Sequence, residues 1–261
     1  ENRTCVGILT KKNIMKTFSL LRTDPASAAY NMALDAEIFS RFLVDKIPVL
    51  RIYSWEAAAL TYGISQQAEN EIDINRCSCD GVQIAQRITG GGVLFHQDEI
   101  TYSLVCAKAD VGEDEKVFVD YRGICAFLIY FYKSLGLKPC FALEAKDFKN
   151  KSVAHELCSA SREKYDIVIN GRKIGGNAQK RKREMIFQHG SIPLSIDWDF
   201  LRRYVKNLPV NISSEATALS QELISMPSRQ ILEQKLIDAF AHTFKVNFIE
   251  EKAPYETALV K

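Results

Sequence analysis

The sequence predicts an α+β fold with mixed or antiparallel sheets. Segments rich in β-branched and aromatic residues, which are typical of strands, outnumber the helical segments that could connect parallel strands. Several of these segments also follow one another across short turns, as hairpins do. The chain has 261 residues, of which 47% are hydrophobic, so it can bury a sizeable core. We expect one domain over residues 15–261, because no repeat or linker interrupts them.

The N-terminal part is predicted to begin with a strand at Met15 and to continue with a helix over residues 25–43. In the second segment, apolar residues recur close to the 3.6-residue period of an amphipathic helix. Residues 49–55 and 59–63 are rich in β-branched and aromatic residues, and they are predicted to form a pair of strands. Residues 1–14 are interpreted as an N-terminal extension, either native or introduced for expression.

The rest of the chain is predicted to contain helices and at least one hairpin. Residues 117–135 have a helical apolar period and end at Gly136, a residue type common at helix C-termini. Residues 165–171 and 172–179 are predicted to form a hairpin, because the first of them ends in the turn signal Asn-Gly. Two more helices are expected, over residues 197–205 and 227–244.

The charge distribution excludes some classes of protein. A net charge of +2 argues against a dedicated nucleic-acid binder. The basic run Lys180–Arg183 could meet an acidic protein or a phosphate, but a solvated turn between two strands is the simpler interpretation. No run approaches the roughly 20 apolar residues of a membrane span, and no secretory signal pattern opens the chain. We therefore expect a cytoplasmic protein that does not bind a membrane.

The seven cysteines form an odd, irregularly spaced set, which fits a reducing compartment better than a disulfide framework. Cys106, Cys125 and Cys140 have apolar neighbours and are expected to be small buried hydrophobes. Cys77 and Cys79 could be half of a zinc site, but no second pair at ligand spacing follows them. We therefore expect no metal.

Three consecutive glycines, Gly90, Gly91 and Gly92, are the most informative feature of the sequence. Strand-like residues precede them at 81–85 and follow them at 93–105. Glycine permits positive φ and leaves the backbone uncovered, so amide N–H groups there could bind an acyl carbonyl or a phosphate. A plain hairpin turn is the alternative, since glycine pairs are common in hairpins.

A second glycine-containing segment holds a lysine. Lys173 precedes Gly175 and Gly176 by two and three residues, in the second strand of the predicted hairpin. A lysine in a strand points either to solvent, the commoner case, or into a cleft. In a cleft its ammonium could stabilise a carbonyl oxyanion, a phosphate or a thiolate.

Taken together, four motifs resemble the lipoate A/B protein ligase family. They occur in the family's order, and they are Asn31-Met-Ala-Leu-Asp35, Arg87-Ile-Thr-Gly-Gly-Gly-Val-Leu-Phe-His96, Gly171-Arg-Lys-Ile-Gly-Gly-Asn-Ala-Gln179 and Gln188-His-Gly-Ser191. The resemblance implies the fold of biotin/lipoate protein ligase catalytic domains, which has a larger mixed sheet and a smaller sheet with helices around them. It also implies that a medium-chain acyl group is delivered to a lysine of a lipoyl carrier domain.

The family includes two chemistries. Ligases activate free lipoate with ATP, and many of them carry an additional C-terminal domain. Acyltransferases take octanoyl from the phosphopantetheine arm of acyl carrier protein, and some of them use a cysteine that shortly precedes the hairpin lysine. About 70 residues follow Ser191, and they are expected to belong to the catalytic domain. This favours the transferase.

Cys158 lies fifteen residues before Lys173, a spacing similar to that of the cysteine-dependent octanoyltransferases. Only the thiolate of a cysteine is nucleophilic, and a nearby ammonium favours it. A non-catalytic loop cysteine and a Cys158–His155 hydrolase pair are the alternatives, but no third residue that would orient the histidine is evident. Ser159 is smaller than the residue expected there, and Gly175-Gly-Asn-Ala resembles ligases equally.

The resemblance also implies roles for the other motif residues. Arg87 and the amides of Gly90, Gly91 and Gly92 are expected to border the carbonyl end of the substrate, with His96 supporting the loop or contacting ligand. The opposite wall is expected to contain Gly175, Asn177, Ala178 and His189. Structural hydrogen bonds within the sheet are the alternative for both histidines. An apolar tunnel for the acyl chain could include Tyr30, Tyr62 or Phe95.

The sequence therefore predicts transfer of octanoyl from acyl carrier protein to a lysine of a lipoyl carrier domain or of the glycine-cleavage carrier protein, through a Cys158 thioester. No cofactor is expected for this reaction. An ATP- and Mg-dependent lipoate-protein ligase and an amidotransferase between carrier proteins are alternatives. A non-catalytic module that captures lipoyl domains is a third, which Cys158 and Lys173 argue against.

Overall fold

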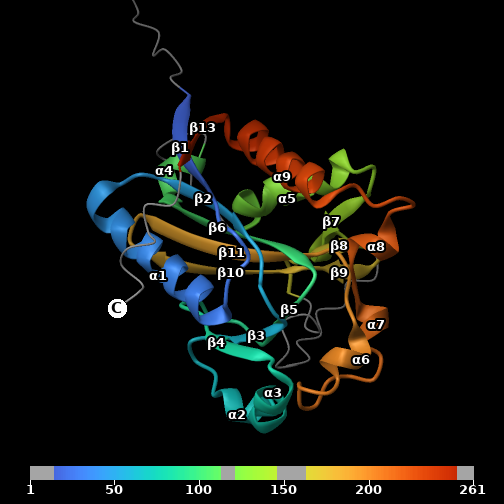
Figure 1. Cartoon of the computed structure of the whole chain (residues 1–261). Coiled ribbons are helices and arrows are strands. Elements are labelled where there is room, and N and C mark those ends of the chain that lie inside the picture. The colour runs from blue at the N-terminus through green and yellow to red at the C-terminus, as the bar shows by residue number, and fades with distance from the viewer. Residues whose placement is uncertain (1–14, 113–120, 146–162, 252–261) are drawn as a thin grey trace, which may run out of the picture.

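A six-stranded mixed sheet forms the middle of the fold (Figure 1). The computed structural model describes residues 15–112, 121–145 and 163–251. In sheet order, the strands are β10 (Gly176–Lys182), β11 (Met185–Pro193), β6 (Glu99–Ala107), β2 (Val49–Tyr53), β1 (Lys16–Arg22) and β13 (Val246–Glu251). The strand β1 runs parallel to both of its neighbours, and the other pairs are antiparallel.

Two smaller sheets complete the β structure. One has the order β12 (Ala216–Thr217), β9 (Arg172–Ile174), β8 (Ile167–Ile169) and β7 (Pro139–Phe141). The other has the order β4 (Gln83–Gln86), β3 (Ala59–Tyr62) and β5 (Leu94–His96). The α+β class and the larger mixed sheet are confirmed, and the described residues contain two smaller sheets where one was expected.

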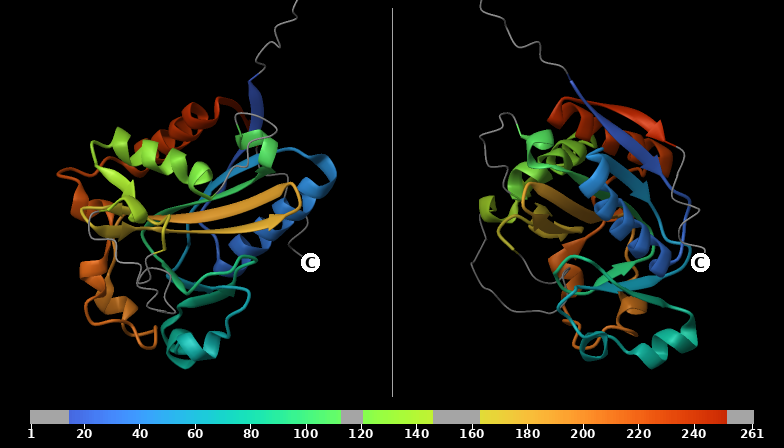
Figure 2. Two further views of the ribbon diagram at one scale, coloured as in Figure 1. Left: turned by 180° about the vertical axis from the view of Figure 1, so that it is seen from behind. Right: turned by 90° about the vertical axis from the view of Figure 1, so that its left-hand side faces the viewer.

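Three long helices cover the two faces of the large sheet. The helix α1 (Ala28–Asp45) lies on one face, whereas α5 (Tyr121–Ser134) and α9 (Arg229–Phe244) lie together on the other, as Figure 2 also shows. The remaining helices are short: α2 (Ala68–Glu71), α3 (Ile74–Asp80), α4 (Lys108–Val111), the 3₁₀ turn η1 (Ala142–Glu144), α6 (Trp198–Leu201), α7 (Ile212–Glu215) and α8 (Leu219–Glu222). No helix in the described ranges is long and apolar enough to cross a bilayer.

Alternation along the strands assigns side chains to the two faces of the large sheet. In β6, Tyr102 and Leu104 belong to the core under α5 and α9, whereas Val105 belongs to the core under α1. Thr101 and Ser103 share the α1 side with Val105, because side chains repeat every second residue in a strand. The α1 side of this sheet therefore carries polar groups as well as apolar ones.

The predicted helices are largely confirmed. The N-cap of α1 is Ser27, whose side chain accepts a hydrogen bond from the Tyr30 amide. After α5 the chain turns at Gly136, which has a φ of 79°. The helix predicted over residues 227–244 is α9. Of the helix predicted over 197–205, only the four residues of α6 are helical, and turns follow them.

The predicted strand pair 49–55 and 59–63 is wrong. Both strands exist, but β2 pairs with β1 and β6, whereas β3 pairs with β4 and β5 in another sheet. The tight link between them carries the chain from one sheet to the next. Propensity identifies strands but does not specify their partners.

The triple-glycine loop is not a hairpin turn. The strands before and after it, β4 and β5, pair with opposite edges of β3 and not with each other. The loop therefore crosses the end of β3, where Gly91 adopts a φ of 98°. It approaches Gly63 closely, because a Cβ atom on Gly63 would lie 2.2 Å from the Gly91 carbonyl oxygen.

The Asn170-Gly171 hairpin is confirmed, but its second strand is shorter than predicted. Both turn residues have positive φ, 51° and 76°, as a type I′ turn requires. The predicted strand 172–179 is interrupted at Gly175, after which β10 joins the large sheet.

Of the three cysteines expected to be buried, Cys106 and Cys125 are buried, whereas Cys140 is only partly buried.

Candidate active site

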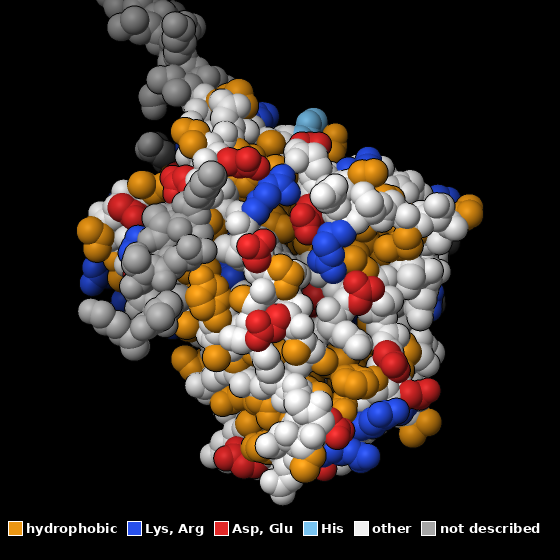
Figure 3. All heavy atoms as spheres, viewed as in Figure 1, with side chains coloured by type: hydrophobic (Ala, Val, Ile, Leu, Met, Phe, Trp, Pro, Cys, Tyr) orange, Lys and Arg blue, Asp and Glu red, His pale blue; other side chains and the backbone are white. Residues whose placement is uncertain are grey.

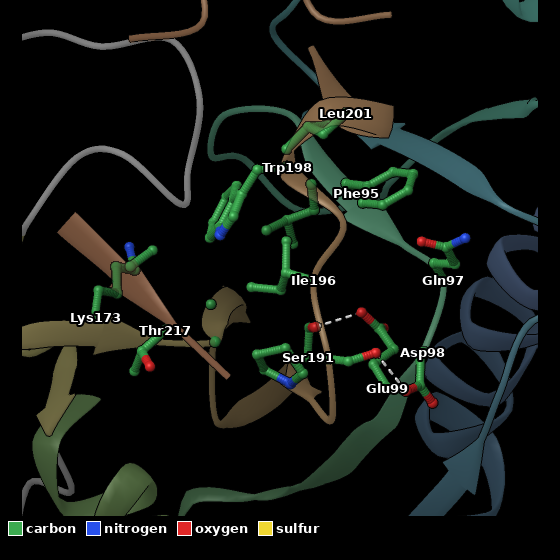
Figure 4. A pocket seen from close by; sticks show the side chains of 16 residues that line it. Phe95, Gln97, Asp98, Glu99, Lys173, Ser191, Ile196, Trp198, Leu201 and Thr217 are labelled. Atoms are coloured by element: carbon green, nitrogen blue, oxygen red, sulfur yellow. Dashed lines mark hydrogen bonds between the residues drawn. The ribbon is translucent and has the colours of Figure 1, made fainter. Parts of the chain in front are cut away.

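Two adjoining pockets lie where the three sheets meet. The first lies between the β9–β10 link, the ends of β5 and β11, and α6 (Figure 4). The second lies between α1 and the triple-glycine loop and is lined by Arg87, His96 and His189. Leu94 and Ser191 line both pockets. The two spaces are therefore neighbours, and they bring together residues of all four motifs, with Met32 of the first motif in the second pocket.

Lys173 lies in the first pocket. Its side chain is only 3% exposed, and Nζ lies 2.8 Å from Oδ2 of Asp166. The lysine is in β9, between β8 and the short parallel strand β12. Of the two orientations that the sequence left open, the structure has the one toward the cleft.

Asp166 is a residue that the sequence analysis did not identify. It precedes β8, in which Val168 pairs directly with Lys173. Asp166 lies two residues before Val168, so its side chain is on the same face of the strand as that of Val168. This position is diagonal to Lys173 across the strand pair, within reach of the long lysine side chain. Once the Asn-Gly turn fixes the register, this diagonal is the signal that could have identified the pair.

Gly175 directs the chain from the small sheet into the large one. Its φ is 72°, and a Cβ atom there would lie 2.1 Å from the Ser191 carbonyl oxygen. A residue with a side chain would therefore displace β9 from β11. Since Lys173 is two residues before this position, the close approach fixes the lysine relative to Ser191.

Arg87 holds the triple-glycine loop from within. Its guanidinium donates to the carbonyl oxygen and Oγ1 of Thr61, at 2.6 and 2.8 Å, and to the Gly92 carbonyl oxygen at 2.6 Å. A longer contact of 3.4 Å reaches the Gly90 carbonyl oxygen. In the described part of the chain, none of the three glycines lines the two pockets, whereas Arg87 lines the second.

His96 is part of a buried network with Glu99. Its Nδ1 lies 2.8 Å from Oε1 of Glu99, its Nε2 lies 2.7 Å from Thr61 Oγ1, and its ring stacks on Trp55. Ser191 donates to the other oxygen of Glu99 at 2.5 Å. These contacts are the structural hydrogen bonds that the sequence left open as the alternative role of this histidine. The His96 side chain also lines the second pocket.

The carboxylate of Glu99 is ionised in this network. Burial alone would raise its pKa, but the charge and hydrogen bond of His96, with hydrogen bonds from Ser191 and Thr101, outweigh burial and lower the pKa. The sequence analysis did not identify this residue. A glutamate at the start of a strand whose following residues are mostly apolar is a signal, because such a carboxylate needs buried partners.

His189 belongs to a second buried network, on the α1 side of the sheet. Its Nε2 lies 2.8 Å from Thr89 Oγ1, and its Nδ1 lies 3.8 Å from Oδ2 of Asp35. Arg51 forms a buried ion pair with Asp35 at 2.8 Å. Burial lowers the pKa of His189, and the charges of Arg87 and His96 add to that effect, although Asp35 opposes it. This histidine is therefore neutral at pH 7.

Asp35 keeps its charge although it is fully buried. Burial alone would raise its pKa, but Arg51, His189 and a hydrogen bond from Ser103 together outweigh burial and lower it. The hydroxyl of Tyr53 also donates to Asp35, at 2.9 Å. The first motif, Asn31 to Asp35, thus anchors α1 to the large sheet.

Asn177 and Ala178 lie on opposite faces of the large sheet. Ala178 pairs with His189, whereas Asn177 pairs with Gly190 and accepts a hydrogen bond from the Tyr102 hydroxyl at 2.7 Å. The Asn177 side chain thus contacts the layer that contains α5. It lines neither of the two described pockets, and neither does Ala178.

Cys158 and His155 lie outside the described residues. Of the three aromatic residues considered for an acyl tunnel, Phe95 lines the first pocket. Tyr30 packs against the core under α1, and Tyr62 packs against the core of the three-stranded sheet.

The basic run lies at the β10–β11 turn, where Arg181 to Arg183 are exposed. This agrees with the interpretation of the run as a solvated turn between two strands.

The walls of the first pocket are mostly apolar, with Leu94, Phe95, Ile196 and Leu201 opposite a single lysine ammonium. Ligand sites generally combine apolar walls with a few polar groups that fix orientation. The arrangement suits an aliphatic chain that carries a carbonyl group. Within the described residues no cluster of side chains could hold a metal ion.

The face of the molecule that Figure 3 shows is mixed in character. Figure 3 shows acidic, basic and apolar side chains interspersed over the face in view, without a single extended basic area. This distribution agrees with the small net charge of the chain. Surfaces of nucleic-acid binders are instead dominated by basic patches.

Comparison with known proteins relates the chain to enzymes of protein lipoylation. The "Octanoyltransferase LipM" of Clostridioides difficile is 28% identical over 257 residues, which cover 95% of this chain and 94% of the relative. That of Bacillus cereus is 32% identical over 248 residues, covering 90% and 88%.

Solved structures share the fold at lower identity. A lipoate-protein ligase A bound with ATP superposes with a TM-score of 0.74 at 22% identity, over 92% of this chain and 90% of that one. The bipartite lipoate protein ligase of Thermoplasma acidophilum gives 0.72 at 21% identity, over 93% and 89%. Residues 27–241 match the lipoyl protein ligase A/B catalytic domain family. The chain therefore belongs to the lipoyl protein ligase A/B catalytic domain family, and relatives that match nearly its whole length are octanoyltransferases.

Proposed function

We propose that this protein transfers an octanoyl group from acyl carrier protein to a lysine of a lipoyl carrier domain, through a thioester on Cys158. The octanoyltransferase relatives support octanoyl transfer in protein lipoylation. The observation that carries the cysteine route is the buried ammonium of Lys173, which lines an apolar pocket and follows Cys158 by fifteen residues.

The reaction consists of two acyl exchanges. The Cys158 thiolate attacks the carbonyl carbon of the donor thioester, a new C–S bond forms, and the donor leaves as a thiolate that takes up a proton. The amine of the acceptor lysine then attacks the enzyme thioester, an amide C–N bond forms, and the cysteine thiol is restored. No ATP is consumed, because a thioester is exchanged for a thioester and then for a more stable amide.

Lys173 has two tasks in this scheme. Its ammonium favours the thiolate form of the cysteine before attack. It also stabilises the negative charge that develops on the carbonyl oxygen during each attack. Asp166 keeps the ammonium in place through the 2.8 Å ion pair. The covalent intermediate allows the two protein substrates to bind in turn.

The acceptor and the location complete the proposal. A lipoyl domain fits as acceptor, since the Thermoplasma ligase of the same fold is described with its E2 lipoyl domain. The glycine-cleavage carrier protein is the second candidate acceptor. We place the reaction in the cytoplasm, because the cysteines of the described ranges are free thiols, as a reducing compartment requires.

Intact mass measurement tests the proposal directly. The protein is incubated with octanoyl acyl carrier protein without ATP, and an added octanoyl group is expected on the wild type. The Cys158→Ala variant should form no adduct, whereas Cys79→Ala, which removes an exposed cysteine on α3, should form it normally. ATP-dependent pyrophosphate release from lipoate without an adduct would instead establish a ligase that uses ATP and Mg. Octanoyl uptake from an octanoylated carrier domain would establish an amidotransferase.

A further inference from the structure

Trp198 has a buried hydrogen-bond donor without an acceptor. The residue opens α6 and lines the first pocket, and among the described residues no group accepts a hydrogen bond from its Nε1. An indole nitrogen can only donate. Because the large majority of buried polar groups in native proteins are hydrogen-bonded, an orphaned donor in a pocket wall indicates a missing acceptor.

The orientation of the indole directs this donor into the pocket. Figure 4 shows the nitrogen at the edge of the ring that faces the space between Lys173 and Ile196. Lys173 reaches the same space from β9, on the opposite wall. Two donors from different elements thus border one space whose other walls are largely apolar.

The second tryptophan of the chain provides a contrast. Trp55 lies in the neighbouring pocket, and its Nε1 donates to Glu99 Oε1 at 3.1 Å and to Thr101 Oγ1 at 2.8 Å. Its hydrogen-bonding capacity is met by the protein. The open donor is therefore a property of Trp198 and not of indole groups in this fold in general.

The charges around the pocket decide which acceptor suits the indole. Asp98 and Glu99 line the pocket, and Lys173 is paired with Asp166. Asp98 and Glu99 have basic neighbours of their own, Arg229 and His96, so the described lining carries no excess positive charge that would attract an anionic ligand such as a phosphate. An ammonium has no lone pair to accept from the indole. A neutral carbonyl oxygen fits both limits.

We infer that the indole N–H of Trp198 donates a hydrogen bond to a carbonyl oxygen of the acyl donor and so helps to position the thioester in the Lys173 pocket. The inference rests on the proposed function, because that function supplies the donor. Two carbonyl sources share this chemistry, the octanoyl thioester itself and the amides of the pantetheine arm.

NMR of the indole N–H groups tests the inference without relying on turnover. The sequence has two tryptophans, so the ¹⁵N-labelled Cys158→Ala protein should give two indole signals, and Trp198→Phe in the same background identifies one of them. At saturation with S-octanoyl-pantetheine, the indole proton of Trp198 should shift downfield. The indole proton of Trp55 should keep the chemical shift that it has in the ligand-free protein. The S-octanoyl thioester of ethanethiol, which has no amide, should cause the same shift if the acyl carbonyl is the acceptor. If pantetheine without the octanoyl group shifts the Trp198 proton, an amide of the pantetheine arm is the acceptor.

Steady-state kinetics of variants that keep Cys158 give the second measurement. Trp198→Phe keeps an aromatic ring and removes the N–H, so KM for the octanoyl donor should rise about three- to tenfold with kcat nearly unchanged. Tyr130→Phe, an equally conservative change at an exposed site on α5, should leave both constants unchanged.

The outcomes separate this inference from the proposed function. An unmoved Trp198 signal at saturating ligand, or an unchanged KM in Trp198→Phe, overturns the inference while the wild type still forms its octanoyl adduct. Failure of the wild type to form the adduct overturns the proposed function, and with it the role assigned to Trp198.

Discussion

The Nζ atom of Lys173 lies 2.8 Å from Oδ2 of Asp166, and both side chains are buried. An isolated ammonium in this position would be costly, because burial removes its water shell. The aspartate therefore permits a cation to stand beside an apolar pocket. The pair links the turn before β8 with β9, so it also contributes to the stability of the four-stranded sheet.

Removal of the aspartate charge is expected to destabilise the protein strongly. Asp166→Asn leaves the Lys173 ammonium without its counter-charge, and breaking a buried pair in this way costs about 3–5 kcal/mol. Glu37→Gln breaks the pair of Glu37 with Arg41 at the surface of α1, where the expected loss is below about 1 kcal/mol. Urea unfolding of both variants measures the difference. Equal losses would contradict the importance of burial for the first pair.

A side chain at Gly175 is expected to disturb the site more than one at Gly171. Both glycines have positive φ, so Gly→Ala costs about 1–2 kcal/mol at either position for backbone conformation alone. At Gly175 the new Cβ would also lie 2.1 Å from the Ser191 carbonyl oxygen, whereas no atom lies within 4 Å of a Cβ at Gly171. Gly175→Ala should therefore lower Tm by several degrees more than Gly171→Ala, and it should reduce transferase activity. Thermal unfolding and the octanoyl transfer rate check both parts, and matching Tm values would show that Ser191 can move.

Much of this fold follows from local signals. The Gly136 stop of α5 and the Asn170-Gly171 turn each act within a few residues, and the sequence predicts both. Strand partners depend on residues that are distant in the chain. This is why β2 and β3 were wrongly paired, and why the break between β9 and β10 at Gly175 was missed.

The residues of the candidate site also fall into two groups, those that sequence motifs identify and those that they do not. The motifs identified Arg87, His96, Lys173 and His189, which line the two pockets. Asp166, Glu99 and Trp198 belong to no motif, since their importance depends on register or on a neighbouring element. Asn177 shows the reverse limit, because a motif includes it while strand alternation turns its side chain to the other face.

The Asp35–Arg51 pair predicts acid sensitivity. The pKa of Asp35 is lowered in the folded protein, so its contribution to stability is present above its unfolded pKa of about 3.9 and is lost as the pH falls through the folded value. Asp35→Asn leaves Arg51 buried without its partner and should cost about 3–5 kcal/mol at pH 7. Measured from pH 7 to pH 2.5, the gap in unfolding free energy between wild type and variant should narrow below pH 4. A gap that stays constant would contradict the assigned charge state of Asp35.

His189 predicts a second, milder pH dependence at higher pH. Burial lowers its pKa in the folded protein below the value of about 6.5 in the unfolded chain. Above pH 6.5 the imidazole is neutral in both states. As the pH falls below 6.5, the unfolded chain takes up this proton first, so the free energy of unfolding should decrease until the folded pKa is reached. His189→Gln removes the titrating group and should flatten the stability profile between pH 7 and pH 5. His242→Gln, at an exposed position of α9 where the ring stacks on Tyr130, should retain the wild-type slope. Denaturant unfolding at half-unit pH steps measures the three profiles, and a slope that survives in His189→Gln would assign the proton uptake to another group.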